Sequence, residues 1–242
     1  MDILSQIDRN KLPHHIAVIM DGNGRWAKGQ GGIRIFGHRS AIKAVRETTE
    51  CAAELGVDFL TLYAFSTENW NRPKAEVEGL MTLLVDTIHG ETPTLQKNNI
   101  RLNAIGNLAA LPEKCLSTLQ TCMNITANNT GMLLTLALSY GSRNDITLAV
   151  QKIAEQVKKG LLLPENIDDK TIKAALSTHN IPDPELLIRT SGEQRISNFL
   201  LWEIAYTELY ITPKLWPDFR KEDLIAAILE FQGRDRRFGN VS

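Results

Sequence analysis

Short apolar runs of strand length alternate with longer segments of helical periodicity, and this alternation constrains the fold more than any other feature of the chain. The six runs are Ile16–Met20, Phe59–Phe65, Ile100–Ile105, Met132–Ser139, Leu186–Arg189 and Glu208–Ile211. Such alternation predicts an α/β fold with a mostly parallel central sheet of about six strands, flanked by helices. No Pro/Gly/Ser-rich linker or repeat divides the sequence. We therefore expect residues 1–242 to form a single domain, with flexible ends at residues 1–12 and 239–242.

The charge balance limits the partners that the chain can attract. The 242 residues carry 27 Lys and Arg against 28 Asp and Glu, which gives a formal net charge of -1. No global field therefore draws the protein to nucleic acid or to an anionic membrane. We expect no nucleic-acid partner, and any recognition of anions must be local.

The cysteines and the apolar stretches indicate the cellular compartment of the protein. The three cysteines, Cys51, Cys115 and Cys122, show no CxxC spacing and fall in helix-like apolar patterns, which is typical of buried, reduced thiols. The N-terminus has no signal-peptide core, and the longest apolar patches fall well short of the roughly 20 residues that span a bilayer. We expect a cytoplasmic protein, and transient contact with a membrane surface stays compatible with this.

Polar loops that contain arginine follow four of the six predicted strands. These loops read DGNGRW from residue 21, STENWNRP from residue 66, YGSRND from residue 140 and RTSGEQRIS from residue 189. In an open parallel sheet the carboxyl ends of the strands meet at one edge, where ligands bind. The sequence therefore predicts a concentrated anion site at that edge of a nearly neutral protein.

The first loop looks like a dinucleotide-binding turn but lacks the rest of that motif. Gly22-x-Gly24-x-x-Ala27 follows a strand, as the dinucleotide motif requires. A strand ending in an acid should come about 20 residues later, but that span is a helical pattern around Glu47 and Glu50. No GxxxxGK[ST] sequence is present either. A nucleotide-binding oxidoreductase and P-loop chemistry are therefore both disfavoured.

Purely structural explanations stay open for each loop residue taken alone. Asp21 can cap a following helix, and the glycines can serve a tight turn. Residues 66–69 can cap a helix near Lys74–His89, with Pro73 in its first turn. A lone His38 is more often packed or solvated than bound to a ligand. Helix caps do not require so many arginines, however, and their joint occurrence favours a function.

Two groups of cationic and polar side chains suggest that two separate anions are held. The groups are Arg25, Arg34 and His38 in one case and Arg189, Arg195 and Ser197 in the other. Arginine forks match phosphate oxygens, and the glycine loop adds backbone N–H donors. Asp21 and Glu208 lie at the end of the first strand and near the last, and such carboxylates beside diphosphates suit Mg²⁺. The combination points to Mg²⁺-dependent joining of two apolar phosphorylated molecules.

Three stretches resemble signature segments of the cis-prenyltransferase family. They are HHIAVIMDGNGRWAKGQGGIRIFGH from residue 14, LYAFSTENWNRP from residue 62 and IRTSGEQRISNFLLWEIAYTELYITPKLWPDF from residue 188. The resemblance runs from Pro13 to Gly239. It implies a non-Rossmann α/β fold with an apolar tunnel and a homodimer. It also implies Mg²⁺-dependent elongation of farnesyl diphosphate by cis addition of isopentenyl diphosphate, giving a long-chain polyprenyl diphosphate.

The resemblance implies roles for the matched residues. Asp21 would be the essential acid that binds Mg²⁺ and helps the allylic diphosphate leave, and Glu208 would complete the metal site. The allylic diphosphate would be held by Gly22, Asn23, Gly24, Arg25, Arg34 and His38. Isopentenyl diphosphate would be held by Arg189, Arg195 and Ser197. The side where a proton is lost would be lined by Ser66, Asn69 and Arg72, with Asn69 in a catalytic role. The cleft would be shaped by Trp26 and Trp70, for which plain packing is an equal alternative.

Other features refine this prediction. The apolar faces of Val77–Ile88 and Met132–Leu138 are candidates for the tunnel walls, with ordinary core as the favoured alternative. The pair Asp168-Asp169 is expected in a polar loop, so the DDxxD cluster of trans-prenyltransferases is missing. Residues 27–34 read AKGQGGIR where the family usually has a basic run with proline, which predicts a looser loop over the site. A non-catalytic partner subunit is disfavoured, because such relatives typically lose the first-loop acid and the RxSGExRxS-like segment, which this chain keeps.

Overall fold

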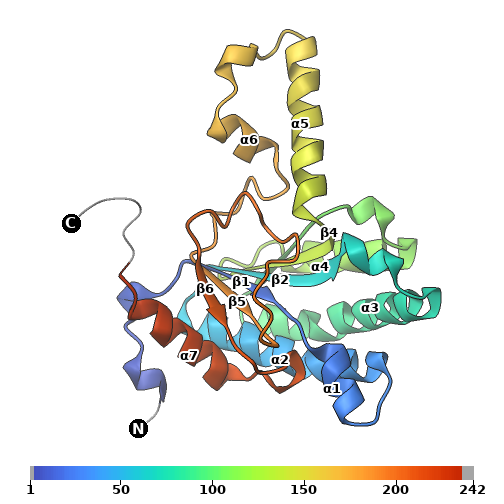
Figure 1. The fold of residues 1–242 in the computed structure, drawn as a ribbon, viewed down its shortest axis with the longest axis vertical. Helices are drawn as coiled ribbons and strands as arrows, with labels where there is room; N and C mark the ends of the chain where they lie inside the picture. The colour runs from blue at the N-terminus through green and yellow to red at the C-terminus, as the bar shows by residue number, and fades with distance from the viewer. Residues whose placement is uncertain (1–2, 236–242) are drawn as a thin grey trace.

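In the computed structural model, which describes residues 3–235, six parallel strands form one central sheet (Figure 1). The strands are β1 (His15–Ile19), β2 (Phe59–Ser66), β3 (Arg101–Ile105), β4 (Leu133–Tyr140), β5 (Leu186–Arg189) and β6 (Glu208–Ile211). Their order is β3-β4-β2-β1-β5-β6, and every neighbouring pair is parallel. All six predicted strands are thus confirmed, and their order differs from the 3-2-1-4-5-6 order of dinucleotide-binding sheets.

Seven α-helices accompany the sheet in the described residues. They are α1 (Asn23–Gly29), α2 (Arg34–Leu55), α3 (Lys74–Lys97), α4 (Glu113–Thr126), α5 (Ser142–Lys158), α6 (Asp169–Ala175) and α7 (Lys221–Gln232). Helices α2, α3, α4 and α7 cover one face of the sheet, whereas α5 and α6 project from the body of the molecule (Figure 1). None of the described helices is long and apolar enough to cross a bilayer.

Alternate residues of the central strands feed two separate apolar cores. On β1, Ile16 and Val18 pack with the layer of α2, α3, α4 and α7, while Ala17 and Ile19 face a second core. That second core contains Phe199 and other residues of the segment after β5. Because both faces of the sheet are covered, its strands read as continuous apolar runs. Phe199 and the adjoining Leu200 are therefore core residues.

Three local expectations have different outcomes. The cysteines are buried and unpaired, as predicted. The prediction of a loop holds for Asp168 and is wrong for Asp169, because Asp168 caps α6 by accepting a hydrogen bond from the Thr171 N–H at 2.8 Å and Asp169 is the first residue of that helix. The flexible N-terminus stays a prediction. Residues 3–11 include two short 3-10 helices, while residues 1–2 and the predicted flexible end at 239–242 lie outside the described residues.

Candidate active site

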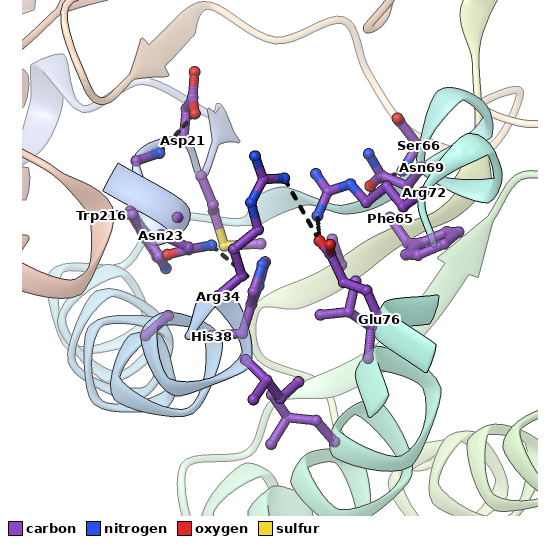
Figure 2. Close-up of a pocket in the computed structure, with 18 of the residues that line it drawn as sticks. Asp21, Asn23, Arg34, His38, Phe65, Ser66, Asn69, Arg72, Glu76 and Trp216 are labelled. Atoms are coloured by element: carbon purple, nitrogen blue, oxygen red, sulfur yellow. Dashed lines mark hydrogen bonds and ion pairs between the residues drawn. The ribbon is translucent and has the colours of Figure 1, made fainter. Parts of the chain in front are cut away.

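A cleft of about 1430 Å³ opens at the carboxyl ends of β1, β2 and β5, between α2 and α3 (Figure 2). Its rim carries charged residues from the loops after these three strands and from the start of α2 and α3. Its interior is apolar and is lined by α2 and α3. The loop after β4 does not line it, so three of the four predicted loops come together at the site.

The loops after β1 and β5 together hold a group of ionised side chains, which we call the β5 cluster. Its members are Asp21, Arg25, Arg189, Glu193 and Arg195. Arg189 Nη2 donates to Asp21 Oδ2 at 2.9 Å, and Arg189 Nη1 donates to Ser197 Oγ at 2.8 Å and to the Arg195 carbonyl. The Arg189 side chain is only 4% exposed, so its guanidinium is fixed by oxygens of its own chain.

Asp21 is held as a carboxylate by this cluster. Burial acts to raise its pKa, but hydrogen bonds from Arg189, Ser191 and the Gly22 N–H outweigh burial and hold the pKa below its usual value. The Gly22 N–H donates to Asp21 Oδ1 at 2.6 Å. The Thr190 hydroxyl donates to the Asp21 carbonyl at 2.7 Å, which ties the β1 loop to the β5 loop. The side chain of Asp21 does not cap α1, because Gly22 is the cap residue.

The loop after β5 adopts a strained backbone around these contacts. Ser191, Ser197 and Asn198 have φ angles of 78°, 48° and 62°, in the left-handed region that non-glycine residues rarely occupy. Arg25 donates to the Ser191 carbonyl at 3.1 Å and lies 3.3 Å from Glu193. Such outliers persist where surrounding contacts over-determine the backbone, as they do at this site.

A second charged group, which we call the α2–α3 cluster, faces the first across the cleft. Its members are Arg34, His38, Arg72 and Glu76. Glu76 Oε1 accepts from Arg72 Nη1 at 3.0 Å and lies 3.7 Å from Arg34 Nη1, and both interactions converge on Glu76 in Figure 2. One carboxylate thus links the start of α2 to the start of α3.

His38 is neutral at physiological pH. Burial, followed by the positive charges of Arg72 and Arg34, lowers its pKa from the usual 6.5 to about 4, against an opposing effect of Glu76. Its Nδ1 lies 3.3 Å from Asn23 Nδ2. The side-chain amide oxygen of Asn23, Oδ1, is buried and has no hydrogen-bond partner among the described residues.

Two glycines allow the first loop to pack so closely against α2 and the segment before α7. Gly22 has a φ of 108°, and a Cβ there would lie 2.8 Å from Leu215 Cδ2. A Cβ on Gly37 would lie 2.0 Å from the Asn23 carbonyl oxygen, so α2 can approach the start of α1 only with glycine at this position. The glycines of this segment therefore position Asn23 and Gly24 beside His38 and Arg34.

The loop after β2 supplies Ser66, Asn69 and Arg72 to the rim. Residues Thr67–Asn71 form a 3-10 helix that Ser66 caps, and the Ser66 N–H donates to Asn69 Oδ1 at 3.1 Å. The structural alternative in which residues 66–69 cap the helix near Lys74–His89 is therefore excluded, because Pro73 is the cap residue of α3.

The apolar interior includes part of one candidate wall and none of the other. The apolar α3 residues that line the cleft are Leu80, Met81, Leu83 and Leu84, whereas Val77 and Ile88 of the same face are core residues. No residue of Met132–Leu138 lines it, because β4 lies between β2 and β3 and is buried along its length. Ala41, Ile42 and Val45 of α2 complete the wall.

Neither predicted tryptophan lines the cleft. The Trp26 indole N–H donates to Asp218 at 2.8 Å, and its ring lies against Phe36. The Trp70 indole N–H donates to Ser139 Oγ at 2.9 Å, and its ring meets Phe65 edge to face. The alternative of plain packing therefore describes both residues, while Trp216, which was not predicted, does line the cleft.

The structure does not bring Glu208 to Asp21 within one chain. Glu208 is the first residue of β6, and the register pairs it with Leu186 at the start of β5, whereas Asp21 follows the far end of β1. Glu208 instead pairs with Arg234 at 2.8 Å. The predicted pair is wrong for a single chain, because parallel strands place the first residue of one at the edge opposite the last residue of another.

A model of the prenyltransferase family described as undecaprenyl diphosphate synthase matches residues 19–239. The isoprenyl transferase of Heliobacterium mobile is 49% identical over 236 residues, which cover 98% of this chain and 91% of that relative. The chain belongs to the cis-prenyltransferase family. A second relative in this family is the ditrans,polycis-undecaprenyl-diphosphate synthase of Pasteurella multocida, named as specific for (2E,6E)-farnesyl diphosphate. It is 48% identical over 236 residues, 98% of each chain.

A solved structure shares the fold of this cis-prenyltransferase. It is the crystal structure of lavandulyl diphosphate synthase from Lavandula x intermedia in complex with dimethylallyl diphosphate. It is 39% identical to this chain, with a TM-score of 0.92, and the match covers 96% of this chain and 100% of that one. Family membership makes the chain an enzyme of cis-prenyl chain elongation.

Within this cis-prenyltransferase site, the cationic groups differ from the predicted grouping. Arg25 was predicted to lie with Arg34 and His38, but it contacts Asp21 and Glu193 in the β5 cluster. Arg72 takes its place beside Arg34. The reason is that Arg25 lies on α1 and bonds to Ser191 of the loop after β5, whereas Arg34 lies on a different helix, at the start of α2.

Three acids of the site, Glu68, Glu76 and Glu193, were not predicted as site residues. Glu76 lies four residues after Arg72, a spacing that would have suggested a helical ion pair. Glu68 accepts from Asn198 Nδ2 at 2.9 Å and links the β2 and β5 loops. No local pattern signals that second contact, because it joins residues 130 positions apart.

Proposed function

We propose that this enzyme elongates farnesyl diphosphate by sequential cis condensation of isopentenyl diphosphate, in a Mg²⁺-dependent reaction. The proposed product is undecaprenyl diphosphate, the precursor of a lipid carrier for cell-wall synthesis, made by a cytoplasmic homodimer. One observation carries the proposal: two arginine clusters face each other across the mouth of a cleft whose interior is apolar. Two diphosphate groups and a growing hydrocarbon chain need this division of the surface.

The residues present fit a magnesium ion that is held mainly by substrate. Mg²⁺ commonly takes one or two carboxylates together with phosphate oxygens. Asp21 supplies one ionised carboxylate at the cleft. The described residues contain no group of three or more His, Cys, Asp or Glu side chains that could form a metal cage. When bound, Mg²⁺ would supply positive charge to the leaving diphosphate.

The arginines perform the remaining electrostatic work in this proposal. When the allylic carbon–oxygen bond breaks, negative charge develops on the diphosphate, and fixed cations around it stabilise that charge. Arg34 and His38 with the first loop would hold the allylic diphosphate, and Arg189, Arg195 and Ser197 would hold isopentenyl diphosphate. The new carbon–carbon bond forms between them, and a proton leaves the isopentenyl unit near Ser66 and Asn69. The lengthening hydrocarbon chain enters the apolar interior of the cleft, between α2 and α3.

The test is incubation of the purified protein with farnesyl diphosphate, labelled isopentenyl diphosphate and Mg²⁺, followed by mass spectrometry of the extracted lipids. A ladder that ends at undecaprenyl length supports the proposal. The Asp21→Ala variant should lose at least about 10²-fold in rate, and EDTA should abolish product. Absence of labelled lipid from folded wild-type protein overturns the proposed activity, and a shorter final product overturns the chain length alone.

A further inference from the structure

The α1–α2 segment combines strong positive charge with exposed apolar side chains. Residues 22–46 contain six Lys and Arg and no Asp or Glu, in a chain whose net charge is -1. Ile33, between the two helices, is 74% exposed, and Phe36 in the first turn of α2 is 45% exposed. An exposed apolar pair within a cationic surface is typical of a protein region that meets an anionic membrane interface.

These side chains share one side of the molecule. Gly37, Ala41 and Ala44 form the buried side of α2. Phe36, Arg39 and Lys43 follow at spacings of three and four residues on the other side, where helical geometry groups them. In Figure 1, the connection between α1 and α2 projects from the lower right of the molecule, away from both chain termini.

The acids near this surface leave two of its cations uncompensated. Lys43 lies 3.6 Å from Glu47, and Asp218 accepts a hydrogen bond from Trp26. Arg34 lies 3.7 Å from Glu76. Among residues 3–235, no ion pair involves Lys28 or Arg39, and both side chains are exposed. The surface therefore keeps a net positive charge that complements an anionic bilayer.

The same surface adjoins the mouth of the cleft. Lys28, Gly32 and Ile33 belong to its lining as well as to the exposed corner. We propose that Lys28, Ile33, Phe36, Arg39 and Lys43 form a docking surface for the headgroup region of an anionic membrane. Ile33 and Phe36 enter the interface, and the three cations contact lipid phosphates. The choice of a lipid surface as occupant rests in part on the proposed long-chain lipid product.

A second corner of the molecule offers matched controls. Leu161, just beyond α5, is 75% exposed and thus equals Ile33 in apolar exposure. Its neighbours Lys158 and Lys159 are balanced by Glu155 and Glu165, so the local charge is neutral. Changes at this corner remove one exposed aliphatic side chain and two cations, as the test variants do, without touching the proposed docking surface.

The experiment is co-sedimentation of the full chain with vesicles of phosphatidylglycerol and phosphatidylcholine, compared with vesicles of phosphatidylcholine alone. We expect binding to the anionic vesicles that is at least about tenfold stronger and that weakens with salt. Ile33→Ser should weaken binding roughly tenfold, and the pair Lys28→Gln with Arg39→Gln roughly thirtyfold. Leu161→Ser and the pair Lys158→Gln with Lys159→Gln should stay within about twofold of wild type.

Several outcomes overturn the docking surface. They are a wild-type chain that ignores anionic vesicles, equal losses in the control variants, or an Ile33→Ser variant that binds as wild type. A chain that self-associates through this corner, and loses that association in Ile33→Ser without binding vesicles, also overturns it. Because the vesicle assay contains no substrate, vesicle binding without lipid synthesis refutes only the proposed function. Lipid synthesis in detergent without vesicle binding refutes only the docking surface.

Discussion

The β5 cluster and the α2–α3 cluster contain the same kinds of side chain, but the arginine at the centre of the first, Arg189, and Arg34 of the second are held in opposite ways. Arg189 lies on a strand, is almost fully buried and donates to three oxygens of its own chain. Arg34 begins a helix, is 64% exposed, and lies 3.7 Å from a single carboxylate, that of Glu76. One side of the cleft is therefore built in advance, whereas the other can rearrange when an anion arrives.

This difference assigns different tasks to the two sides. A buried arginine whose two terminal nitrogens are bonded to its own chain is ordered during folding, and it fixes the geometry of Asp21. Arg34 and Arg72, which share Glu76, can exchange that carboxylate for a diphosphate at the point where α2 meets α3. The variants below alter one cluster at a time.

The largest effect is expected for Arg189→Lys. A lysine keeps the charge but cannot reach Asp21, Ser197 and the Arg195 carbonyl together, so kcat/KM should fall about 10²- to 10³-fold. Loss of these buried contacts should also lower the free energy of unfolding by roughly 2–3 kcal/mol. Steady-state kinetics and urea denaturation measure both quantities. Arg143→Lys, on an exposed residue after β4, is the control. A mutant within a few-fold of wild type would contradict the preorganised role of Arg189.

A smaller effect of opposite sign is expected for Glu76→Gln. Removal of the carboxylate leaves Arg34 and Arg72 without their shared counter-ion, so inorganic pyrophosphate should bind about three- to tenfold more tightly. Titration calorimetry at two salt concentrations measures this change. Glu78→Gln, which affects only an exposed pair with Lys74, should leave the affinity unchanged. Weaker binding in Glu76→Gln would mean that Glu76 positions the arginines instead of competing with the anion.

The smallest effect concerns the protonation of His38. Its pKa of about 4 lies below the usual 6.5, so its contribution to stability is complete above pH 6.5 and is lost as the pH falls towards 4. A bound diphosphate offsets the charges of Arg72 and Arg34 and should raise this pKa by roughly one unit. NMR titration of the imidazole with and without pyrophosphate measures the change. His15, whose pKa burial likewise lowers to about 4, lies in the core and should not respond. A free-state pKa near 6.5, or one that ignores pyrophosphate, would contradict the arrangement.

Local patterns predicted much of this molecule because they depend on neighbours in sequence. The strands lie where the apolar runs predicted them, since a strand that is buried on both faces of the sheet must be continuously apolar. The loops that follow β1, β2 and β5 reach one edge, because parallel strands share a direction. The motifs quoted from residues 14, 62 and 188 led to the family that the comparisons confirm.

Side-chain partners were less predictable, because they depend on distances between segments far apart in the chain. Asp169 was expected in a loop, but Asp168 caps a helix that begins there. For Trp26 and Trp70 the cleft and plain packing were equal alternatives, and the structure shows packing, with the indoles bonded to Asp218 and Ser139. A polar or aromatic residue near a motif has several possible partners, and only packing selects among them.

The sequence by itself determined the six strands and their order along the chain, the amphipathic helices between them and the family. It also determined which loops carry the charges, since each of these properties is written in residues close together along the chain. Only the tertiary structure decided that Arg25 joins Arg189, that Glu76 links Arg34 to Arg72, and that Glu208 lies at the other end of the sheet. Those partnerships depend on strand register and on the close approach of α1 to α2 at Gly37. Such contacts exist only once distant segments have packed together.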